Sequence, residues 1–234
     1  MNLLYEGKAK KIFQGPEKNQ HVMYFKDDAT AFNNLKKASI DTKGILNLKI
    51  ATHIFNYLGQ NGIESHYIKT LSDREMLVKA VTIIPLEVVV RNIAAGNLCK
   101  RLGITEKTKI EPSLVEFYYK KDELGDPILT DDHIQMMKIA SPQDVQNLKA
   151  TALKINHLMI EYFRKLGIIL VDFKIEFGKD EKGNILLADE ISPDSCRLWD
   201  SKTMEIMDKD RFRKDLGGLT EAYTEVLKRM ESGK

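Results

Sequence analysis

Residues 170–199 read LVDFKIEFGKDEKGNILLADEISPDSCRLW, and their pattern predicts the central strands of the protein. Apolar and charged side chains alternate through its first half, which is the period of a strand with two different faces. One face carries Val171, Phe173, Ile175 and Phe177, and the other carries Asp172, Lys174 and Glu176. Successive charged residues on such a strand lie about 6–7 Å apart. The pattern predicts a strand with one apolar face and, on the other, a row of carboxylate, ammonium and carboxylate.

A second strand is predicted directly after the first. The polar turn KDEKGN is followed by the apolar run Ile185–Ala188, which ends in Asp189 and Glu190. This is the pattern of a β-hairpin whose loop is longer than two residues. If the two strands pair, Asp189 or Glu190 lies beside the charged row. A Ser-Pro-Asp turn then presents Arg197.

The charged row allows two interpretations. A charged strand face is most often the solvated side of an antiparallel sheet. Here the apolar neighbours favour a strand well inside the protein, where clustered carboxylates repel each other unless a cation lies between them. Proteins hold Mg²⁺ with few carboxylates and leave the other positions to phosphate oxygens. The row and the nearby lysine and arginine residues are therefore a candidate Mg²⁺ and phosphate site.

Composition is that of an ordinary globular protein. The chain has 234 residues, of which 43% are hydrophobic and 30% charged, with a net charge of +2. This balance gives no indication of a nucleic-acid partner or a membrane-binding basic patch. No apolar run approaches the roughly 20 residues of a membrane span, and MNLLYEGKAKK lacks the apolar core of a signal peptide. Cys99 and Cys196 have neither metal nor redox spacing, which is typical of reduced cytoplasmic thiols.

The N-terminal part is rich in predicted strands, which lie at residues 3–6, 10–14, 21–26, 67–70 and 75–84, the last closed by Pro85. Gly7-Lys8-Ala9-Lys10 joins the first two, and such a hairpin offers backbone N–H groups and lysines to phosphates. No G-x-x-x-x-G-K-[ST] or G-x-G-x-x-G motif is present. Idle, solvated lysines are the ordinary alternative. Residues 27–33 are predicted to form a polar loop.

Helices are predicted at three places. Apolar residues recur at helical spacing in 45–58 and 219–230, and between 145 and 162 after the capping Ser141 and Pro142. A short aromatic strand is predicted at 115–119. A soft boundary at Ile84-Pro85 divides the chain into a strand-rich lobe (1–84) and a mixed lobe (85–234), with a nucleotide in the cleft between them.

Several long strings resemble one known family. The run 170–178, DEISPD at 189–194 and RLWD at 197–200 are similar to phosphoribosylaminoimidazole-succinocarboxamide synthases (SAICAR synthetases). So are IIPLEVVVRN at 83–92, IAAGNL at 93–98 and the EGKAK hairpin at 6–10. The resemblance covers nearly the whole chain.

The resemblance implies an α+β fold, with an antiparallel nucleotide-binding lobe, a larger mixed α/β lobe and the ATP site in the cleft between them. It also implies a cytoplasmic ligase of purine biosynthesis that uses ATP and Mg²⁺ and assembles as a homodimer or a higher oligomer. Such a ligase joins the carboxylate of carboxyaminoimidazole ribonucleotide (CAIR) to the amine of L-aspartate. The products are SAICAR, ADP and phosphate, by way of an acyl phosphate.

Site residues are carried over from the resemblance position by position. It places Lys8, Ala9, Lys10, Lys120 and Glu176 at ATP, and it makes Glu176 and Asp189 the Mg²⁺ ligands. For CAIR it selects Arg91, Asn97, Lys174 and Arg197, and for catalysis Asp172, Lys174 and Arg197.

Arg91 and Asn97 each leave a question open. From the residues alone, Arg91 at the end of an apolar strand suits a phosphate, or else a structural ion pair with Glu87 or another carboxylate. The chain departs from the family at Asn97, where the family usually has Ser. Asn can donate and accept hydrogen bonds as Ser does, although its side chain is longer.

Two other functions remain open at this level. A small-molecule kinase would transfer phosphate to a hydroxyl group, but no kinase-type H-R-D loop is present. A non-enzymatic nucleotide-binding module would keep the 7–10 hairpin, but it has no reason to cluster Asp172, Lys174, Glu176 and Asp189.

Overall fold

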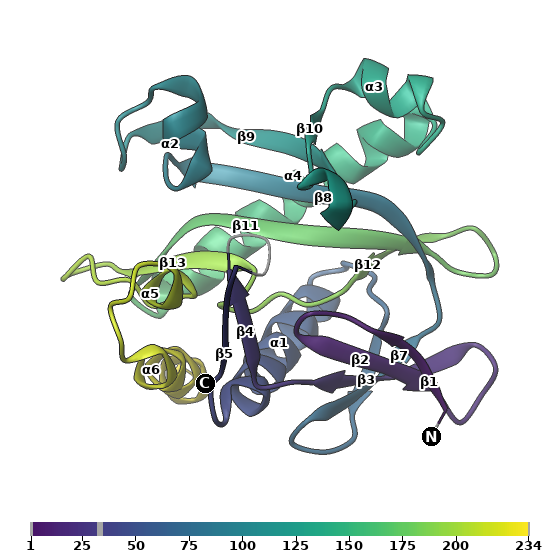
Figure 1. Cartoon of the computed structure of the whole chain (residues 1–234), viewed down its shortest axis with the longest axis horizontal. Helices are drawn as coiled ribbons and strands as arrows, with labels where there is room; N and C mark the ends of the chain where they lie inside the picture. The colour runs from purple at the N-terminus through teal and green to yellow at the C-terminus, as the bar shows by residue number, and fades with distance from the viewer. Residues whose placement is uncertain (1, 32–34, 234) are drawn as a thin grey trace.

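The computed structural model describes residues 2–31 and 35–233. Within these residues the strands form sheets of five, six and two strands. The five-stranded sheet is antiparallel, and it lies beside the larger sheet in Figure 1. Its order is β1 (Leu3–Glu6), β2 (Lys10–Gln14), β3 (Gln20–Phe25), β7 (Glu75–Lys79) and β6 (Tyr67–Thr70). The three N-terminal strands predicted from the sequence are confirmed.

The six-stranded sheet is built around β11 (Ile168–Lys179), the strand predicted from the alternating stretch. β11 pairs with three strands: β8 (Thr82–Ile93), β12 (Ile185–Ala188) and β13 (Cys196–Asp200). β9 (Lys109–Tyr119) and β10 (Ile128–Leu129) extend the sheet beyond β8. The predicted hairpin is confirmed, with Glu176 opposite Ala188 and therefore next to Asp189.

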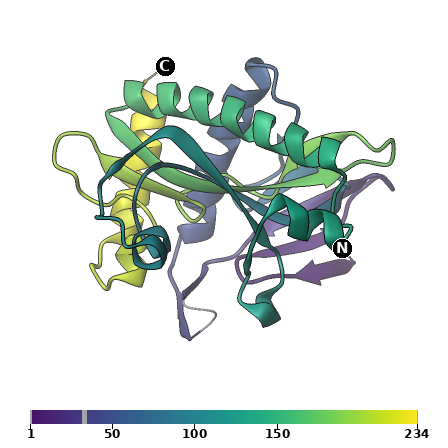
Figure 2. The same cartoon turned by 90° about the horizontal axis from the view of Figure 1, so that it is seen from above.

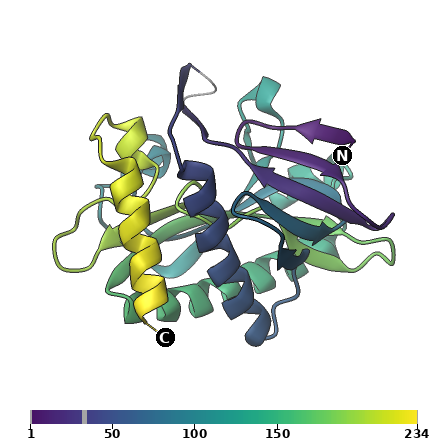
Figure 3. The ribbon, with the colours of Figure 1, turned by 90° about the horizontal axis from the view of Figure 1, so that it is seen from below.

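Three helices match the predictions closely. α4 (Pro142–Lys165) begins at Ser141, whose hydroxyl accepts a hydrogen bond from the N–H of Asp144 in a capping box. It packs against β11 and crosses the sheet in Figure 2. α1 (Lys43–Gln60) and α6 (Leu219–Ser232) lie side by side in Figure 3 and are in contact. The shorter helices are α2 (Asn97–Leu102), α3 (Asp131–Met136), α5 (Asp210–Arg213) and a 3₁₀ turn at Asp122–Leu124.

One strand prediction is wrong. The predicted strand 75–84 is two strands, because β7 ends at Lys79 and β8 begins at Thr82 and continues past Pro85. Proline is tolerated there because it lies at a bulge, between residues that pair regularly with β11. Its carbonyl still accepts a hydrogen bond from the N–H of Lys120, at 3.1 Å.

Two other segments hold more strand than predicted. β9 begins at Lys109, upstream of the predicted 115–119. Most of the predicted polar loop 27–33 is a strand, because β4 (Asp28–Ala31) pairs with β5 (Lys36–Ser39). Residues 32 and 33 of that loop lie outside the described residues.

One apolar core cluster runs from Met23 to Met230 and so draws on both predicted lobes. The boundary at Ile84-Pro85 falls inside β8 and stays a prediction. In the described part of the chain, no helix has both the length and the apolar character needed to cross a bilayer.

Candidate active site

The charged row of β11 is buried, and it leads from one cavity to another. Asp172 and Glu176 are 3% and 2% exposed, which rules out the solvated interpretation of this face. Asp172 lines one cavity, Glu176 lines a second, and Lys174, between them on the strand, lines both. The cavities hold about 310 and 380 Å³, which is the size range of small-molecule sites.

We call the two spaces the Arg197 cavity and the Lys10 cavity. The Arg197 cavity lies between β8, β11 and β13, and it includes Arg91, Asn97, Tyr118, Asp172 and Arg197. The Lys10 cavity lies under the first hairpin, and it includes Lys8, Ala9, Lys10, Lys120, Glu176 and Asp189. Five residues line both cavities and so mark their junction: Glu87, Lys174, Asp194, Ser195 and Arg213.

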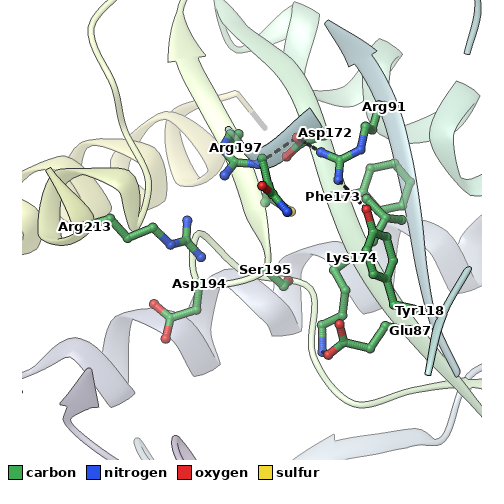
Figure 4. Close-up of a pocket in the computed structure, with 13 residues that line it drawn as sticks. Glu87, Arg91, Tyr118, Asp172, Phe173, Lys174, Asp194, Ser195, Arg197 and Arg213 are labelled. Carbon is green, nitrogen blue, oxygen red and sulfur yellow. Dashed lines mark hydrogen bonds and ion pairs between the residues drawn. The ribbon is translucent and has the colours of Figure 1, made fainter. Parts of the chain in front are cut away.

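Asp172 holds two arginines in the Arg197 cavity (Figure 4). Its Oδ2 accepts hydrogen bonds from Arg91 Nη1 at 2.9 Å and from Arg197 Nη1 at 2.8 Å. Arg91 Nε also donates to Glu116, and Arg197 Nε donates to Asp210. Burial alone would lower the pKa of Arg197, but these two aspartates outweigh it and raise the pKa. Both guanidinium groups are therefore fixed and charged at the cavity wall.

The ion pair weighed for Arg91 in the sequence is present, although its partners are Asp172 and Glu116 rather than Glu87. Arg91 is only 6% exposed, yet it still lines the cavity. The structural and the binding interpretation of this residue are thus compatible.

Gly96 leaves room for Arg197 beside the N-terminus of α2. A Cβ atom at Gly96 would lie 2.8 Å from Cζ of Arg197, and the φ angle of 60° also favours glycine. The group that lies close to the backbone of the Ala-Ala-Gly turn is thus the guanidinium group of Arg197. Asn97 follows as the first residue of α2 and lines the same cavity.

Lys10 pairs with two carboxylates in the Lys10 cavity. Its ammonium donates to Asp189 and, at 2.8 Å, to Glu190 Oε1. Burial alone would lower the pKa of Lys10, but the two carboxylates raise it. The pKa of Asp189 is lowered despite burial, because Lys10 and Lys174 face it.

Lys174 is surrounded by carboxylates at the junction. Its Nζ lies 2.6 Å from Glu176 Oε1 and 3.3 Å from oxygens of both Asp189 and Glu87. Burial opposes the charge, but these carboxylates hold the pKa of Lys174 well above its usual value. Lys174 is therefore an ammonium group, with the negative charges already arranged around it.

The remaining predicted nucleotide residues lie at the rim of the Lys10 cavity. Lys120 donates to Glu176 Oε1 at 2.8 Å, and Lys8 donates to the exposed Asp122 at 2.7 Å. Ala9 lies between the two hairpin lysines, in the turn that joins β1 and β2. All predicted site residues are therefore brought to the two cavities.

The donor set of the Lys10 cavity fits Mg²⁺ only in part. Among the described residues, no group of three or more His, Cys, Asp or Glu side chains could hold a metal ion. Glu176 and Asp189 are two carboxylates that share Lys174 as a partner. Mg²⁺ commonly takes one or two carboxylates and completes its shell with water and phosphate oxygens, so this pair suits a Mg²⁺ ion that arrives with a nucleotide.

Comparison with known proteins now decides the family. The family model described as SAICAR synthetase matches residues 3–230. A phosphoribosylaminoimidazole-succinocarboxamide synthase of Persephonella marina is 57% identical over 228 residues, covering 97% of this chain and 95% of that protein. The homologue of Caldanaerobacter subterraneus is 54% identical and covers 98% and 97% of the two chains. The chain belongs to the SAICAR synthetase family.

Solved structures of SAICAR synthetases share the fold. The phosphoribosylaminoimidazole-succinocarboxamide synthase of Ehrlichia chaffeensis superposes with a TM-score of 0.96 at 48% identity, covering 98% of each chain. A SAICAR synthetase in complex with ADP gives 0.94 at 46% identity, covering 98% of this chain and 97% of the other. The predicted α+β fold of this family is confirmed.

The chain accordingly has the activity of a SAICAR synthetase. It is a carbon–nitrogen ligase that joins CAIR and L-aspartate with ATP in purine biosynthesis. The prediction of a ligase is confirmed, and the kinase and the binding module are set aside.

Several residues of this SAICAR synthetase site were missed in the sequence. Glu116 and Tyr118 alternate on β9 toward Arg91, a period-2 signal that could have identified them. Asp194, Lys209 and Arg213 also line the cavities. Lys209 and Arg213 lie in a charge-rich stretch that has the composition of a solvated surface, and no local signal distinguishes them.

Proposed function

We propose that ATP occupies the Lys10 cavity and CAIR the Arg197 cavity, with the reacting groups meeting beside Lys174. One observation carries this proposal: the row Asp172, Lys174 and Glu176 runs from one cavity through their junction to the other. The solved SAICAR synthetase that holds ADP supports a nucleotide site in this fold.

We further propose that the reaction passes through an acyl phosphate. A carboxylate is a poor electrophile, so an oxygen of the CAIR carboxylate first attacks the γ-phosphorus of ATP and the bond to the β-phosphate oxygen breaks, which releases ADP. The amine of L-aspartate then attacks the acyl carbon, and phosphate leaves with that oxygen. The protons lost by the amine pass to water or phosphate. Catalysis of this kind depends on alignment and charge neutralisation.

Lysines serve the ATP side. Lys8 and Lys10 hold phosphates from the hairpin, where the backbone at Ala9 adds N–H groups, and Lys120 reaches the nucleotide from the opposite wall. Glu176 and Asp189 would hold Mg²⁺, which neutralises phosphate charge when it is bound. Lys10 and Lys174 then exchange part of their contact with these carboxylates for contact with phosphate oxygens.

Arginines serve the CAIR side. Arg91 and Arg197 present fixed forks to the ribonucleotide phosphate, while Asn97 donates from the start of α2. Asp172 orients both arginines. Lys174 lies where charge develops on the CAIR carboxylate as it becomes an acyl phosphate, and there it stabilises the transition state.

The remaining expectations concern the whole molecule. We propose that the segments 1–84 and 85–234 act as lobes around the nucleotide and that the chain works as a cytoplasmic homodimer or higher homo-oligomer. Both cysteines are free thiols, as expected in a reducing compartment.

The test of this proposal is the release of ADP and of SAICAR with Mg²⁺, ATP and CAIR, with and without L-aspartate. Steady ADP release should require both co-substrates and should match SAICAR one to one. Continuous ADP release without L-aspartate, with a stable phosphate ester that accumulates, would contradict the proposal. Lys174→Met should lower turnover by at least about 100-fold, whereas Lys182→Met on the exposed β11–β12 turn should not.

A further inference from the structure

His66 is a buried histidine that contacts a residue of the Lys10 cavity. It is 2% exposed, and Nε2 of its ring lies 3.0 Å from the backbone carbonyl oxygen of Asp189. A carbonyl oxygen can only accept a hydrogen bond, so Nε2 carries the proton and donates it. The imidazole is thus bonded to the backbone of a residue whose side chain lines the Lys10 cavity.

Asp189 has a backbone conformation that is unusual for an aspartate. It follows the last residue of β12, and its φ of 59° lies in the left-handed region. Successive side chains of an extended chain point to opposite sides. The left-handed residue breaks this alternation, and the carboxylates of Asp189 and Glu190 both contact Nζ of Lys10. The conformation of Asp189 thus lets two consecutive carboxylates meet one ammonium group.

This conformation needs support from the residues around it. A residue with a Cβ atom is less stable in the left-handed region than in extended backbone, and it stays there only where its surroundings determine it. The carbonyl of Asp189 belongs to the rigid peptide plane that joins it to Glu190. By holding that carbonyl, the ring of His66 fixes the plane between the two carboxylate residues.

His66 is itself held firmly. Its backbone N–H donates to the carbonyl of Leu187 at 2.8 Å, and its carbonyl accepts from the N–H of Lys79 at 2.7 Å. Ser65 and Leu187 form a parallel bridge, which places the next residue, His66, level with the end of β12. The imidazole also packs against Phe55 of α1, with the ring centroids 5.6 Å apart. His66 thus ties α1 and the five-stranded sheet to the end of β12.

We infer that His66 is a positioning residue, which holds the carbonyl of Asp189 so that the Asp189 and Glu190 carboxylates face Lys10 together. Its effect on turnover rests on the proposed function, in which Asp189 helps to hold Mg²⁺ beside the ATP phosphates. One N–H donor at this place is what the arrangement requires. An amide that reaches the same carbonyl should therefore serve as well as the imidazole.

Two substitutions of His66 separate the donor from the packing. His66→Gln keeps an N–H donor, whereas His66→Leu fills a similar space without one. His66→Leu should lower turnover about 10- to 100-fold, the usual effect of losing a partner that orients a metal ligand, and His66→Gln should stay within about threefold of the wild type. His21→Leu is the matched control, because His21 is a half-buried histidine of β3 that lines neither cavity, and its turnover should be that of the wild type.

A double-mutant cycle tests whether His66 acts through Asp189. In Asp189→Asn the carboxylate is already lost, so adding His66→Leu should lower turnover by less than about twofold more. A general loss of stability that does not act through Asp189 would instead multiply the two effects. Crystal structures give a readout that needs no turnover. The φ of Asp189 should leave the left-handed region in His66→Leu and its carboxylate should move away from Lys10, whereas His66→Gln should keep both features.

Each of these measurements can overturn the inference. It fails if His66→Gln loses as much turnover as His66→Leu, if the two losses multiply in the cycle, or if Asp189 keeps its conformation in His66→Leu. Should His66→Leu not fold, His66→Met replaces it, since the flexible methionine chain packs more easily. Normal turnover of Asp189→Asn would refute the Mg²⁺ assignment and not the positioning, which the crystal structures test alone.

Discussion

Asp172→Asn probes the link between the two arginines and the CAIR phosphate. The carboxylate is buried and receives two guanidinium hydrogen bonds on one oxygen, and an amide oxygen can accept both but cannot balance their charge. Breaking a buried ion pair costs about 3–5 kcal/mol. In this variant Arg91 is still paired with Glu116, and Arg197 is still paired with Asp210. We therefore expect the free energy of unfolding to fall by about 3 kcal/mol, the lower end of this range. For a chain of this length, that lowers Tm by roughly 6–12 °C.

The effect of phosphate on the Tm of Asp172→Asn tests the assignment of Arg91 and Arg197. Removing one negative charge near a bound phosphate strengthens phosphate binding. For an assumed separation of about 8 Å and an effective dielectric constant of about 20, Coulomb's law gives about 2 kcal/mol. Inorganic phosphate or CAIR should therefore raise the Tm of Asp172→Asn by more than it raises that of the wild type. Asp200→Asn is the control, because Asp200 pairs with Arg229 and lines neither cavity. An equal response to phosphate in all three proteins would refute the assignment of Arg91 and Arg197.

Three other changes test separate parts of the site. Asparagine tolerates the left-handed φ of 59° at position 189, so Asp189→Asn removes the charge and keeps the backbone. Turnover should fall at least about 100-fold while the circular dichroism spectrum stays unchanged. Normal turnover would refute the Mg²⁺ assignment. Gly96→Ala should displace Arg197 and raise the KM for CAIR about tenfold, while the KM for ATP stays unaltered. An equal rise in both KM values would contradict the assignment of Arg197 to CAIR. Burial and the Asp210 carboxylate raise the pKa of Asp208 to about 7, above its unfolded value near ~4. In this range the folded state binds one more proton than the unfolded state. As the pH rises from 4 to 7, the free energy of unfolding of the wild type, measured with urea, should therefore fall by about 3 kcal/mol relative to that of Asp208→Asn. A difference between the two proteins that does not change with pH would contradict the raised pKa.

Local patterns predicted the centre of the molecule well. The alternation from Val171 to Phe177 predicted β11, and the apolar run after the polar turn predicted its partner β12. Both predictions succeed because a two-residue period fits a strand and not a helix when the apolar face must be buried. The three β11 side chains of the charged row were likewise identified from spacing alone, since alternate residues share a face.

Long-range pairing accounts for what the sequence did not disclose. The local pattern predicts a strand end at Pro85, whereas the bulge that accommodates this proline depends on the register of β8 with β11. Lys209 and Arg213 reach the site from α5, which contacts β4, a strand far away in sequence. Their surroundings are charged residues without apolar periodicity, a pattern typical of a solvated surface. Sites assembled from distant segments leave no local signature of this kind.

Transfer of isotope from CAIR to phosphate tests the central claim most directly. CAIR carrying ¹⁸O in its carboxylate is turned over with ATP, Mg²⁺ and L-aspartate, and the released phosphate is analysed by mass spectrometry. If the carboxylate attacks the γ-phosphorus beside Lys174, one labelled oxygen appears in each phosphate. Phosphate free of ¹⁸O would show that this oxygen never becomes bonded to phosphorus, and the acyl-phosphate account of the two joined cavities would be wrong.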